Sequence, residues 1–335
     1  MNKLLYLLLI AVCWSWSCSQ DSKTEKHQSK RDQVVDIRDK VKEFSTQDVL
    51  IGRISRTYLI DDYLIVTDYN SPDKLIHLFD KNTFEHLASS TYQGQGPGEI
   101  TIIGHVGIDE ANRRFFVSDH GKLKIFAYDL DSVLTNPDYQ PSVKIDMKKK
   151  LFPDDYLYLN DTLCIARIIE PIGNNDYKPA VARWNMATGE INPMPYEYPD
   201  LKKVRFIYAA SAEHQLYVQC YTQYDLMTIC DFNGNLKCNI YGPKWVNEKT
   251  QTQHYSLGVE FCGDKILALY SGGDHRTDAY YPTKFLVFDL NGNYLKTLET
   301  GYMITDFCYD KENNRLIINL NDEIQFTYLD LEGII

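Results

Sequence analysis

The run YLIVTD at residues 63–68 decides the fold, because apolar, β-branched runs of the same kind recur at nearly constant intervals along the chain. The other five runs are RFFVSD (114–119), LCIARI (163–168), QLYVQC (215–220), KILALY (265–270) and RLIINL (315–320). Their starting positions differ by 51, 49, 52, 50 and 50 residues. A fixed period of this length is typical of repeat architectures, in which each repeat is one supersecondary unit.

A further strand-like run follows each of these six after a turn. These runs are LIHLFD (75–80), LKIFAYD (123–129), AVARWN (180–185), LMTICD (226–231), FLVFD (285–289) and IQFTYLD (324–330). Some continue into Asn-Gly turns, such as Asn233-Gly234 and Asn291-Gly292, which supply the positive φ of tight hairpins. Short apolar stretches also precede the runs, so each unit holds about four antiparallel strands. Six such units predict an all-β, six-bladed β-propeller over residues 34–335.

The last unit is short of one strand, because only residues 331–335 follow IQFTYLD. Residues 34–46 precede the first complete unit and are available to pair with that last blade. We therefore expect the N- and C-terminal segments to close the ring together. Such closure removes an exposed sheet edge, which would otherwise favour aggregation.

Composition and charge agree with a large β domain and exclude one class of partner. Of 335 residues, 44% are hydrophobic, and 25 Tyr and 14 Phe favour strands over helices. Lys and Arg number 35 against 46 Asp and Glu, a net charge of −11. The longest uninterrupted basic run is Lys148-Lys149-Lys150, and no longer Lys/Arg-rich stretch occurs. Because nucleic-acid binding requires clustered basic charge, we expect no nucleic-acid partner.

The N-terminus has the features of an export signal. Residues 1–17 begin with a basic start and an apolar run over residues 4–14, as in a signal peptide. The run ends at Ser15-Trp16-Ser17-Cys18, which resembles the lipobox of bacterial lipoproteins, although that motif usually has Leu where Ser15 stands. Cys18 is therefore the predicted lipidation site, and an ordinary secretory peptide is the alternative.

Residues 18–33 follow as a predicted lipid-anchored, flexible tether, since positions 19–33 contain no aromatic or aliphatic side chain. The expected location is the cell envelope. There the lipid would attach the chain to a membrane, which we expect to be the outer membrane. The propeller would face either the periplasm or the cell surface. The sequence leaves open which leaflet holds the anchor.

The segment Gly94-Gln95-Gly96-Pro97-Gly98-Glu99 resembles the G-x-G-P-G-E signature of TolB-like and NHL-like six-bladed propeller lipoproteins of bacteria. This resemblance implies a propeller on a lipid anchor and assigns no reaction. From the residues themselves, three glycines and a proline predict a turn between two blades. A dinucleotide fingerprint is excluded, because Glu99 stands where its third glycine belongs and Pro97 removes a backbone N–H.

Six cysteines lie in the predicted propeller, at positions 164, 220, 230, 238, 262 and 308. Buried free thiols are favoured, and a bridge from Cys220 to Cys230 or Cys238 is the alternative in a compartment that permits disulfides. No Cys-x-x-Cys pair and no nucleophile or zinc motif occurs in the sequence. We therefore assign no catalytic residue, metal ligand or cofactor.

Propeller geometry indicates where a ligand would bind. Loops between blades and loops between the second and third strands open on one face, and the longest here are residues 169–178 and 271–282. Side chains from these loops and from the starts of the inner strands form the candidate site: Arg53, His105, His120, Arg205, Tyr255, Asp274, His275, Arg276, Asp278 and Tyr280. Aromatic faces beside charged groups suit a sugar or a peptide.

Two functions are compatible with these features. The first is a non-catalytic envelope lipoprotein that binds a protein, peptide or glycan at the loop face. The alternative is a metal-dependent hydrolase or lactonase-like enzyme, whose central channel would need carboxylates from several inner strands around one ion. The expected inner-strand residues are mainly Arg, His, Tyr and apolar, which favours the binding protein over the enzyme. The prominent acids, such as Asp68 and Asp119, lie at strand ends in repeated positions.

Overall fold

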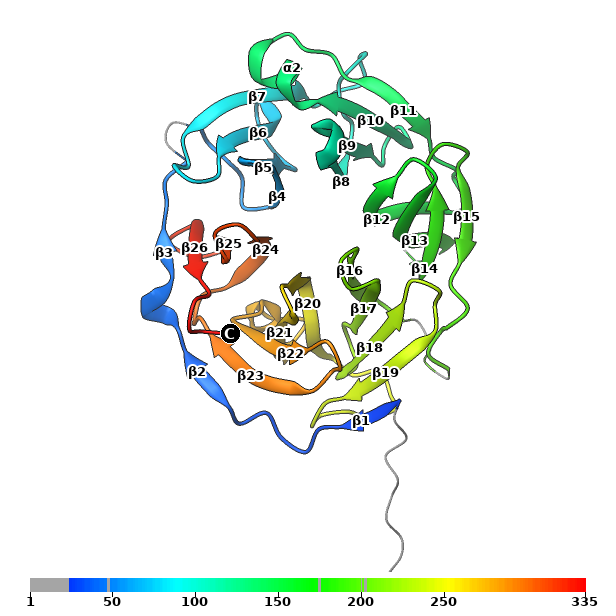
Figure 1. The fold of residues 1–335 in the computed structure, drawn as a ribbon, viewed down its shortest axis with the longest axis vertical. Helices are drawn as coiled ribbons and strands as arrows, with labels where there is room; N and C mark the ends of the chain where they lie inside the picture. Colours follow the sequence, from blue (N-terminus) through cyan, green and yellow to red (C-terminus); the bar gives the residue numbers. More distant parts are fainter. Residues whose placement is uncertain (1–23, 47–48, 174–175, 200, 202–203) are drawn as a thin grey trace, which may run out of the picture.

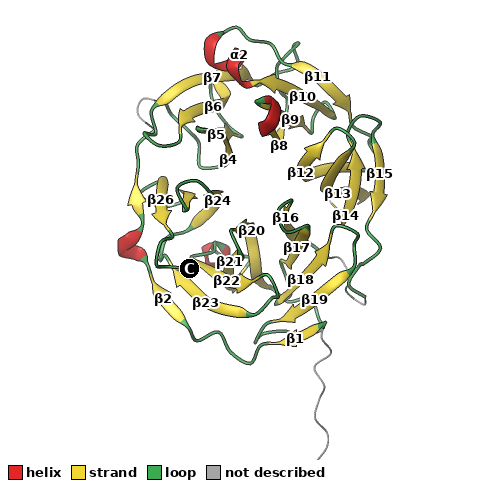
Figure 2. Ribbon diagram, viewed as in Figure 1, coloured by secondary structure: helices red, strands yellow, loops and turns green. Residues whose placement is uncertain are grey.

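Six antiparallel sheets stand in a ring around a central channel, with almost no helix between them (Figures 1 and 2). The computed structural model describes residues 24–46, 49–173, 176–199, 201 and 204–335. The molecule is a six-bladed β-propeller, so the predicted fold class is confirmed.

The blades follow one another along the chain, and each begins with its innermost strand. Blade I contains β4 (Ser55–Ile60), β5 (Tyr63–Asp68), β6 (Lys74–Asp80) and β7 (His86–Tyr92). Blade II contains β8 (Ile103–Asp109), β9 (Arg114–Asp119), β10 (Lys124–Asp129) and β11 (Ser142–Asp146). Blade III contains β12 (Phe152–Asn160), β13 (Leu163–Gly173), β14 (Asp176–Asn185) and β15 (Glu190–Pro193).

The second half of the ring incorporates the N-terminal segment. Blade IV contains β16 (Phe206–Ser211), β17 (Leu216–Tyr221), β18 (Leu226–Asp231) and β19 (Leu236–Tyr241), with β1 (Glu25–His27) at its outer edge. Blade V contains β20 (Thr252–Cys262), β21 (Lys265–Asp274), β22 (Lys284–Asp289) and β23 (Tyr294–Glu299), with β2 (Val34–Asp36) outside. Blade VI contains β24 (Ile304–Asp310), β25 (Arg315–Leu320), β26 (Phe326–Asp330) and β3 (Lys42–Glu43).

The recurring apolar runs are the second strands of the blades. These strands are buried on both faces, because each sheet packs between two neighbouring blades. Between blades IV and V, for example, Val218 and Ile229 pack in one cluster with Ile266 and Ala268. The hydrophobic core is therefore divided into layers between blades, and each fully buried aliphatic side chain contributes about 1.5–3 kcal/mol.

Among the described residues, helical structure is limited to short segments. The α-helix α2 (Leu130–Thr135) links β10 to β11, and 3₁₀ turns lie at Arg38–Lys40, Glu110–Asn112 and Asp278–Tyr280. Within the described part of the chain, none of the helices has the length and apolar character needed to span a bilayer.

Ring closure occurs as the sequence predicts. β3 pairs antiparallel with β26, with Lys42 opposite Tyr328 and Glu43 opposite Thr327. The next residue, Phe44, stacks on Phe84 of blade I with ring centroids 3.8 Å apart. The closing strand therefore joins the last blade to the first through backbone pairing and an aromatic contact.

The N-terminal strap, residues 24–43, corrects one expectation. It runs along the outer rim of blades IV, V and VI, as the dark blue segment of Figure 1 shows, and pairs in turn with β19, β23 and β26. Residues 24–33 are thus not a free tether. Apolar side chains are not needed for this docking, because β1 pairs through backbone groups and His27 stacks on Tyr241 at 4.3 Å. Cys18 and residues 19–23 lie outside the described residues.

The loop over residues 94–99 connects blade I to blade II, as its glycines and proline indicate. The Glu99 carboxylate accepts a hydrogen bond from the Gly96 amide at 2.6 Å, and Gly98 has a φ of +72°. At the end of β9, the buried carboxylate of Asp119 accepts bonds from the amides of Thr101 and Ile102. Acids at the strand ends therefore hold the connections between blades.

All six propeller cysteines are buried free thiols, in agreement with the favoured interpretation. The alternative bridge from Cys220 is not formed. Burial raises the pKa of Cys164 to about 12, so this thiol stays protonated at neutral pH.

Candidate functional site

The inner strands enclose a cavity of about 650 Å³ along the axis of the ring. We call the face on which the inner strands begin the loop face. The cavity extends from Arg205 and Thr222 at the loop face toward Ala210 and Tyr309 near the other ends of the strands. Each inner strand, or the residue leading into it, contributes one acidic or basic side chain: Arg56, His105, Asp155, Arg205, Glu260 and Asp306.

On the side of blades II and III, these groups form a hydrogen-bonded chain. His105 Nδ1 lies 3.1 Å from Asp155 Oδ1, and Nε2 lies 2.8 Å from the carbonyl oxygen of Tyr156. Both ring nitrogens thus face acceptors. Burial lowers the pKa of His105, while the neighbouring Asp155 acts in the opposite direction. The imidazole is therefore fixed in orientation by two contacts with β12.

Arg167 of β13 is fully engaged beside this chain. Its guanidinium donates to both carboxylate oxygens of Asp154, at 3.0 and 2.9 Å, and to the carbonyl of Phe206 at 3.0 Å. This bidentate geometry is the strong form of an Arg–carboxylate pair. Arg167 therefore joins blades III and IV and has little capacity left for a ligand.

On the side of blades V and VI, the cavity holds two carboxyl groups with raised pKa values. Burial raises the pKa of Glu260 to about 8, and the charges of Asp155 and Asp306 act in the same direction. Burial also raises the pKa of Asp306 to about 6, against the opposing effect of Arg56. Asp306 accepts two hydrogen bonds from Thr57, from its amide and its hydroxyl. At neutral pH, Glu260 is largely protonated and can donate a hydrogen bond.

Arg56 differs from the other cavity arginines. Among the described residues it forms no hydrogen bond or ion pair, although the fields of Tyr69, Tyr58 and Asp306 favour its charge. The hydroxyl of Tyr58, two positions along the same strand, is buried and has no partner among those residues. From β4, the cavity thus contains a guanidinium that no described side chain pairs with and a buried hydroxyl without a partner.

Within the described ranges, no three His, Cys, Asp or Glu side chains gather closely enough to hold a metal ion. The sequence predicts few acids on the inner strands. That expectation is wrong, because Asp155, Glu260 and Asp306 all project from inner strands into the cavity. These carboxyl groups face His105, Thr57 and each other, and they do not converge on one point.

A second, smaller cavity of about 280 Å³ lies between blades III and IV at the loop face. Its walls are rich in tyrosine, and they include Tyr177, Tyr196, Tyr198 and Tyr221. This pocket was not predicted from the sequence. The signals for it were Tyr177 in the long 169–178 loop, Tyr221, and the pair Tyr196 and Tyr198 between β15 and β16.

The structure brings two of the predicted site residues into the channel, His105 and Arg205. The Arg205 guanidinium lies 3.6 Å from the centre of the Tyr177 ring and donates to Asp176 at 3.2 Å. Arg53 lies at the rim of the loop face, where it donates to Asn321 at 3.1 Å. His120 packs against the ring of Phe152 beside the channel and does not line the cavity.

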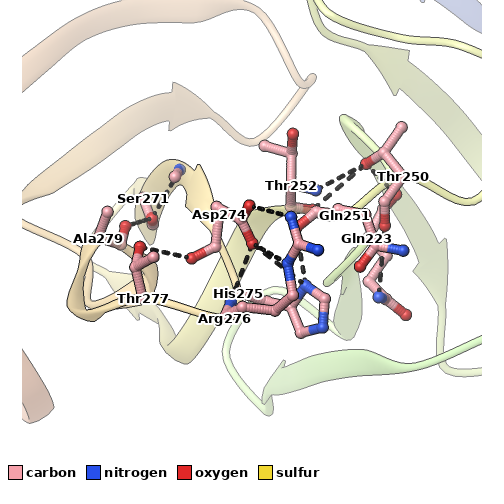
Figure 3. A network of polar contacts seen from close by, with 11 residues as sticks. Gln223, Thr250, Gln251, Thr252, Ser271, Asp274, His275, Arg276, Thr277 and Ala279 are labelled. Atoms are coloured by element: carbon pink, nitrogen blue, oxygen red, sulfur yellow. Dashed lines mark hydrogen bonds and ion pairs between the residues drawn. The ribbon is translucent and has the colours of Figure 1, made fainter.

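Three further predicted residues form a local cluster on the β21–β22 connection (Figure 3). The Arg276 side chain donates to both oxygens of Asp274, and His275 Nδ1 lies 2.9 Å from the carbonyl of Gln251. These bonds order the loop at the face of blade V. Tyr280 packs against Tyr281 in the same connection, with ring centroids 4.2 Å apart, and Asp278 begins the 3₁₀ turn there.

Tyr255 does not reach the channel mouth, so this prediction is wrong. Its side chain is fully buried between blades IV and V, where its hydroxyl accepts a hydrogen bond from Arg31 at 3.1 Å. β20 is irregular after this residue, with a register shift between Tyr255 and Val259. The shift turns Leu257 and Glu260 toward the cavity instead.

Comparison with known proteins supports the fold. A family model described as a six-bladed beta-propeller (DUF5128) matches residues 22–159, which include the strap and blades I and II. No curated protein matches the chain. A crystal structure of a DUF4221 family member from Bacteroides vulgatus is similar with a TM-score of 0.55 and 12% identity, covering 87% of this chain and 95% of that one. A candidate exported protein from Bacteroides fragilis has a TM-score of 0.55 and 9% identity, covering 91% and 98%. At these identities the likeness concerns the fold alone.

Proposed function

We propose that this protein is a non-catalytic, lipid-anchored binding protein of the bacterial envelope. Its loop face and channel would receive a protein, peptide or glycan. The observation that carries the proposal is the channel itself, in which all six blades direct an ionisable side chain into one cavity of about 650 Å³. A concave site with a few convergent polar groups is the usual form of a ligand pocket.

The loop face offers a second surface suited to sugars or peptides. Tyrosines line the smaller pocket next to Arg205, which belongs to the channel wall. Tyrosine combines a large apolar ring with a polar hydroxyl and loses little conformational entropy on binding. An extended ligand could therefore occupy the channel mouth and the tyrosine pocket together.

The strap favours an arrangement in which this face stays open. β1 runs parallel to β19, and β19 ends at the loop face. The chain therefore enters β1 from the rim or the opposite face. Only residues 18–23 separate the proposed lipidation site from the strap, a reach of about 20 Å when extended. A lipid on Cys18 would hold the propeller close to the membrane by its rim, with the channel mouth exposed.

Export is the common feature of the signal-like N-terminus and of the similar Bacteroides fragilis protein, which is described as exported. The envelope location is tested by feeding cells a labelled fatty acid and comparing the wild type with Cys18→Ala and Cys13→Ala variants. We expect label and membrane association to be lost in Cys18→Ala and kept in Cys13→Ala. Equal labelling of all three chains would contradict the anchor.

The binding role is tested with the mature, full-length chain on glycan and peptide arrays. We expect the arrays to identify a ligand. Its affinity should fall in the variant Ile207→Trp, because Ile207 lines the cavity and the larger side chain narrows the channel. A ligand that binds this variant and the wild type equally would place the binding surface elsewhere.

A further inference from the structure

We propose that the channel ligand carries a single carboxylate group, and that Arg56 and Tyr58 of β4 bind it. This inference rests on the proposed binding role of the channel and specifies the chemistry of its ligand. Both side chains line the cavity, and they are two positions apart on one strand. Because side chains alternate along a strand, Arg56 and Tyr58 lie on the same face of β4.

Arg56 is available to a ligand, whereas the other two cavity arginines are engaged. Arg167 is held by both carboxylate oxygens of Asp154 and by the Phe206 carbonyl. Arg205 is stacked on Tyr177 and paired with Asp176. Arg56 has no such partner within the described residues, and its guanidinium cannot lose its proton. Because no protein carboxylate pairs with Arg56 in the described part of the chain, its whole guanidinium fork is open to an anionic ligand in the cavity.

The hydroxyl of Tyr58 is a second donor available in the cavity. This group is buried without a hydrogen-bond partner among the described residues, and its ring packs edge-on against His105 at 5.6 Å. Burial raises the pKa of Tyr58 well above its ordinary value, so the hydroxyl keeps its proton and acts as a donor. A guanidinium fork and one hydroxyl together provide three N–H or O–H donors, which match the lone pairs of one planar carboxylate.

The negative charges of the cavity favour a monoanionic ligand over a phosphate. Asp155 and Asp306 line the same cavity, and their charges already raise the pKa of Glu260. A dianionic group would meet stronger repulsion from these two carboxylates than a singly charged group would. Glu260 itself is largely protonated at neutral pH and adds little repulsion. Acidic sugars and free peptide C-termini both present a single carboxylate.

The test uses the mature full-length chain and four small probes: D-glucuronate, N-acetylglycine, D-glucose and inorganic phosphate. Binding is followed by calorimetry and by the Nε–Hε resonances of ¹⁵N-labelled arginine. We expect one of the two carboxylates to bind and to shift the Arg56 resonance. Stronger binding by D-glucuronate identifies an acidic sugar, and stronger binding by N-acetylglycine identifies a peptide terminus.

The decisive variant is Arg56→Gln. It should lower the affinity for the carboxylate probe about tenfold to a hundredfold, the loss expected when a hydrogen-bonded ion pair is removed. Arg56→Lys keeps the charge without the fork and should give an intermediate affinity. The matched control is Lys311→Gln, which removes one positive charge from an exposed side chain far from the loop face. Unfolding curves confirm that each variant is folded.

Two results would overturn the inference. One is an Arg56 resonance that no carboxylate shifts, and the other is phosphate or D-glucose binding as well as the carboxylates do. A neutral glycan or peptide from the arrays that binds the wild type and Arg56→Gln equally, yet is lost in Ile207→Trp, would refute the carboxylate contact. That pattern would leave the proposed binding role of the channel intact.

Discussion

The guanidinium of Arg31 lies 2.9 Å from the carboxylate of Asp225, and both side chains are almost completely buried although 194 residues separate them. Arg31 belongs to the strap, whereas Asp225 precedes β18 of blade IV. The same guanidinium donates to the Tyr255 hydroxyl and lies 5.1 Å from the centre of the Tyr270 ring in blade V. One strap residue therefore joins two neighbouring blades.

Arg31→Met should destabilise the protein strongly. The substitution keeps much of the aliphatic volume but leaves the Asp225 carboxylate buried without its cation. Removing one partner of a buried pair costs about 3–5 kcal/mol. The free energy of unfolding in urea measures this loss. The double variant Arg31→Met/Asp225→Asn should recover part of it, because no uncompensated charge remains.

Lys30→Met is the matched control for Arg31→Met. Lys30 is the preceding residue, and it pairs with Asp32 at the exposed surface. Solvent screens an exposed pair and leaves it little net contribution to stability, so this variant should unfold almost like the wild type. Equal decreases in the free energy of unfolding would show that any change to the strap destabilises the protein, and that the buried pair is not the cause.

Phe44→Ala tests the closure of the ring. Phe44 stacks on Phe84 of blade I and lies 5.8 Å from the Phe326 ring of blade VI. Because Phe44 is only half-buried, we expect a loss of about 2–3 kcal/mol, below the range for a fully buried Phe. Leu50→Ala, at a side chain that is 82% exposed, should change little. If thermal unfolding of the two variants is the same, closure depends on backbone pairing alone.

Most of the fold could be predicted from the sequence, because the second strand of each blade is apolar on both faces. The runs YLIVTD and RFFVSD coincide with β5 and β9. Six such runs at a constant spacing leave few alternatives. The closing strand could also be predicted, since a blade with three strands requires a fourth.

The strap and much of the site could not be predicted. Residues 24–33 dock through backbone pairing and through Arg31, and neither produces a hydrophobic pattern. The sequence alone does not distinguish three acids, Asp155, Glu260 and Asp306, from the ordinary polar positions of half-exposed strands. They come together only because the ring directs all six inner strands at one axis. The displacement of Tyr255 into the core depends on an irregularity in β20 that no local motif marks.

Gly98→Ala should destabilise the connection between blades I and II. Gly98 has a φ of +72°, and an added Cβ would meet the side chain of Gln140. Left-handed backbone costs about 1–2 kcal/mol for a residue with a Cβ, and displacing Gln140 adds to that loss. Gly333→Ala is the control, because Gly333 has a φ of +69° and open space around its Cβ position. The melting temperature should fall further for Gly98→Ala than for Gly333→Ala. Equal decreases in the two variants would mean that the contact with Gln140 is unimportant.

Glu260→Gln should stabilise the protein, and the gain should grow with pH. Burial raises the pKa of this carboxyl to about 8 from an ordinary value of 4.5, helped by Asp155 and Asp306. Below the ordinary value, Glu260 is neutral in the folded and unfolded states. As the pH rises toward 8, the unfolded chain loses this proton first, so the wild type loses stability relative to a variant that cannot ionise. Melting temperatures of both proteins between about pH 5 and pH 9 measure the difference.

Glu213→Gln should not show this trend, because Glu213 is exposed and its hydrogen bond with Lys311 lowers its pKa. A difference between wild type and Glu260→Gln that stays constant with pH would mean that Glu260 is ionised in the folded protein throughout.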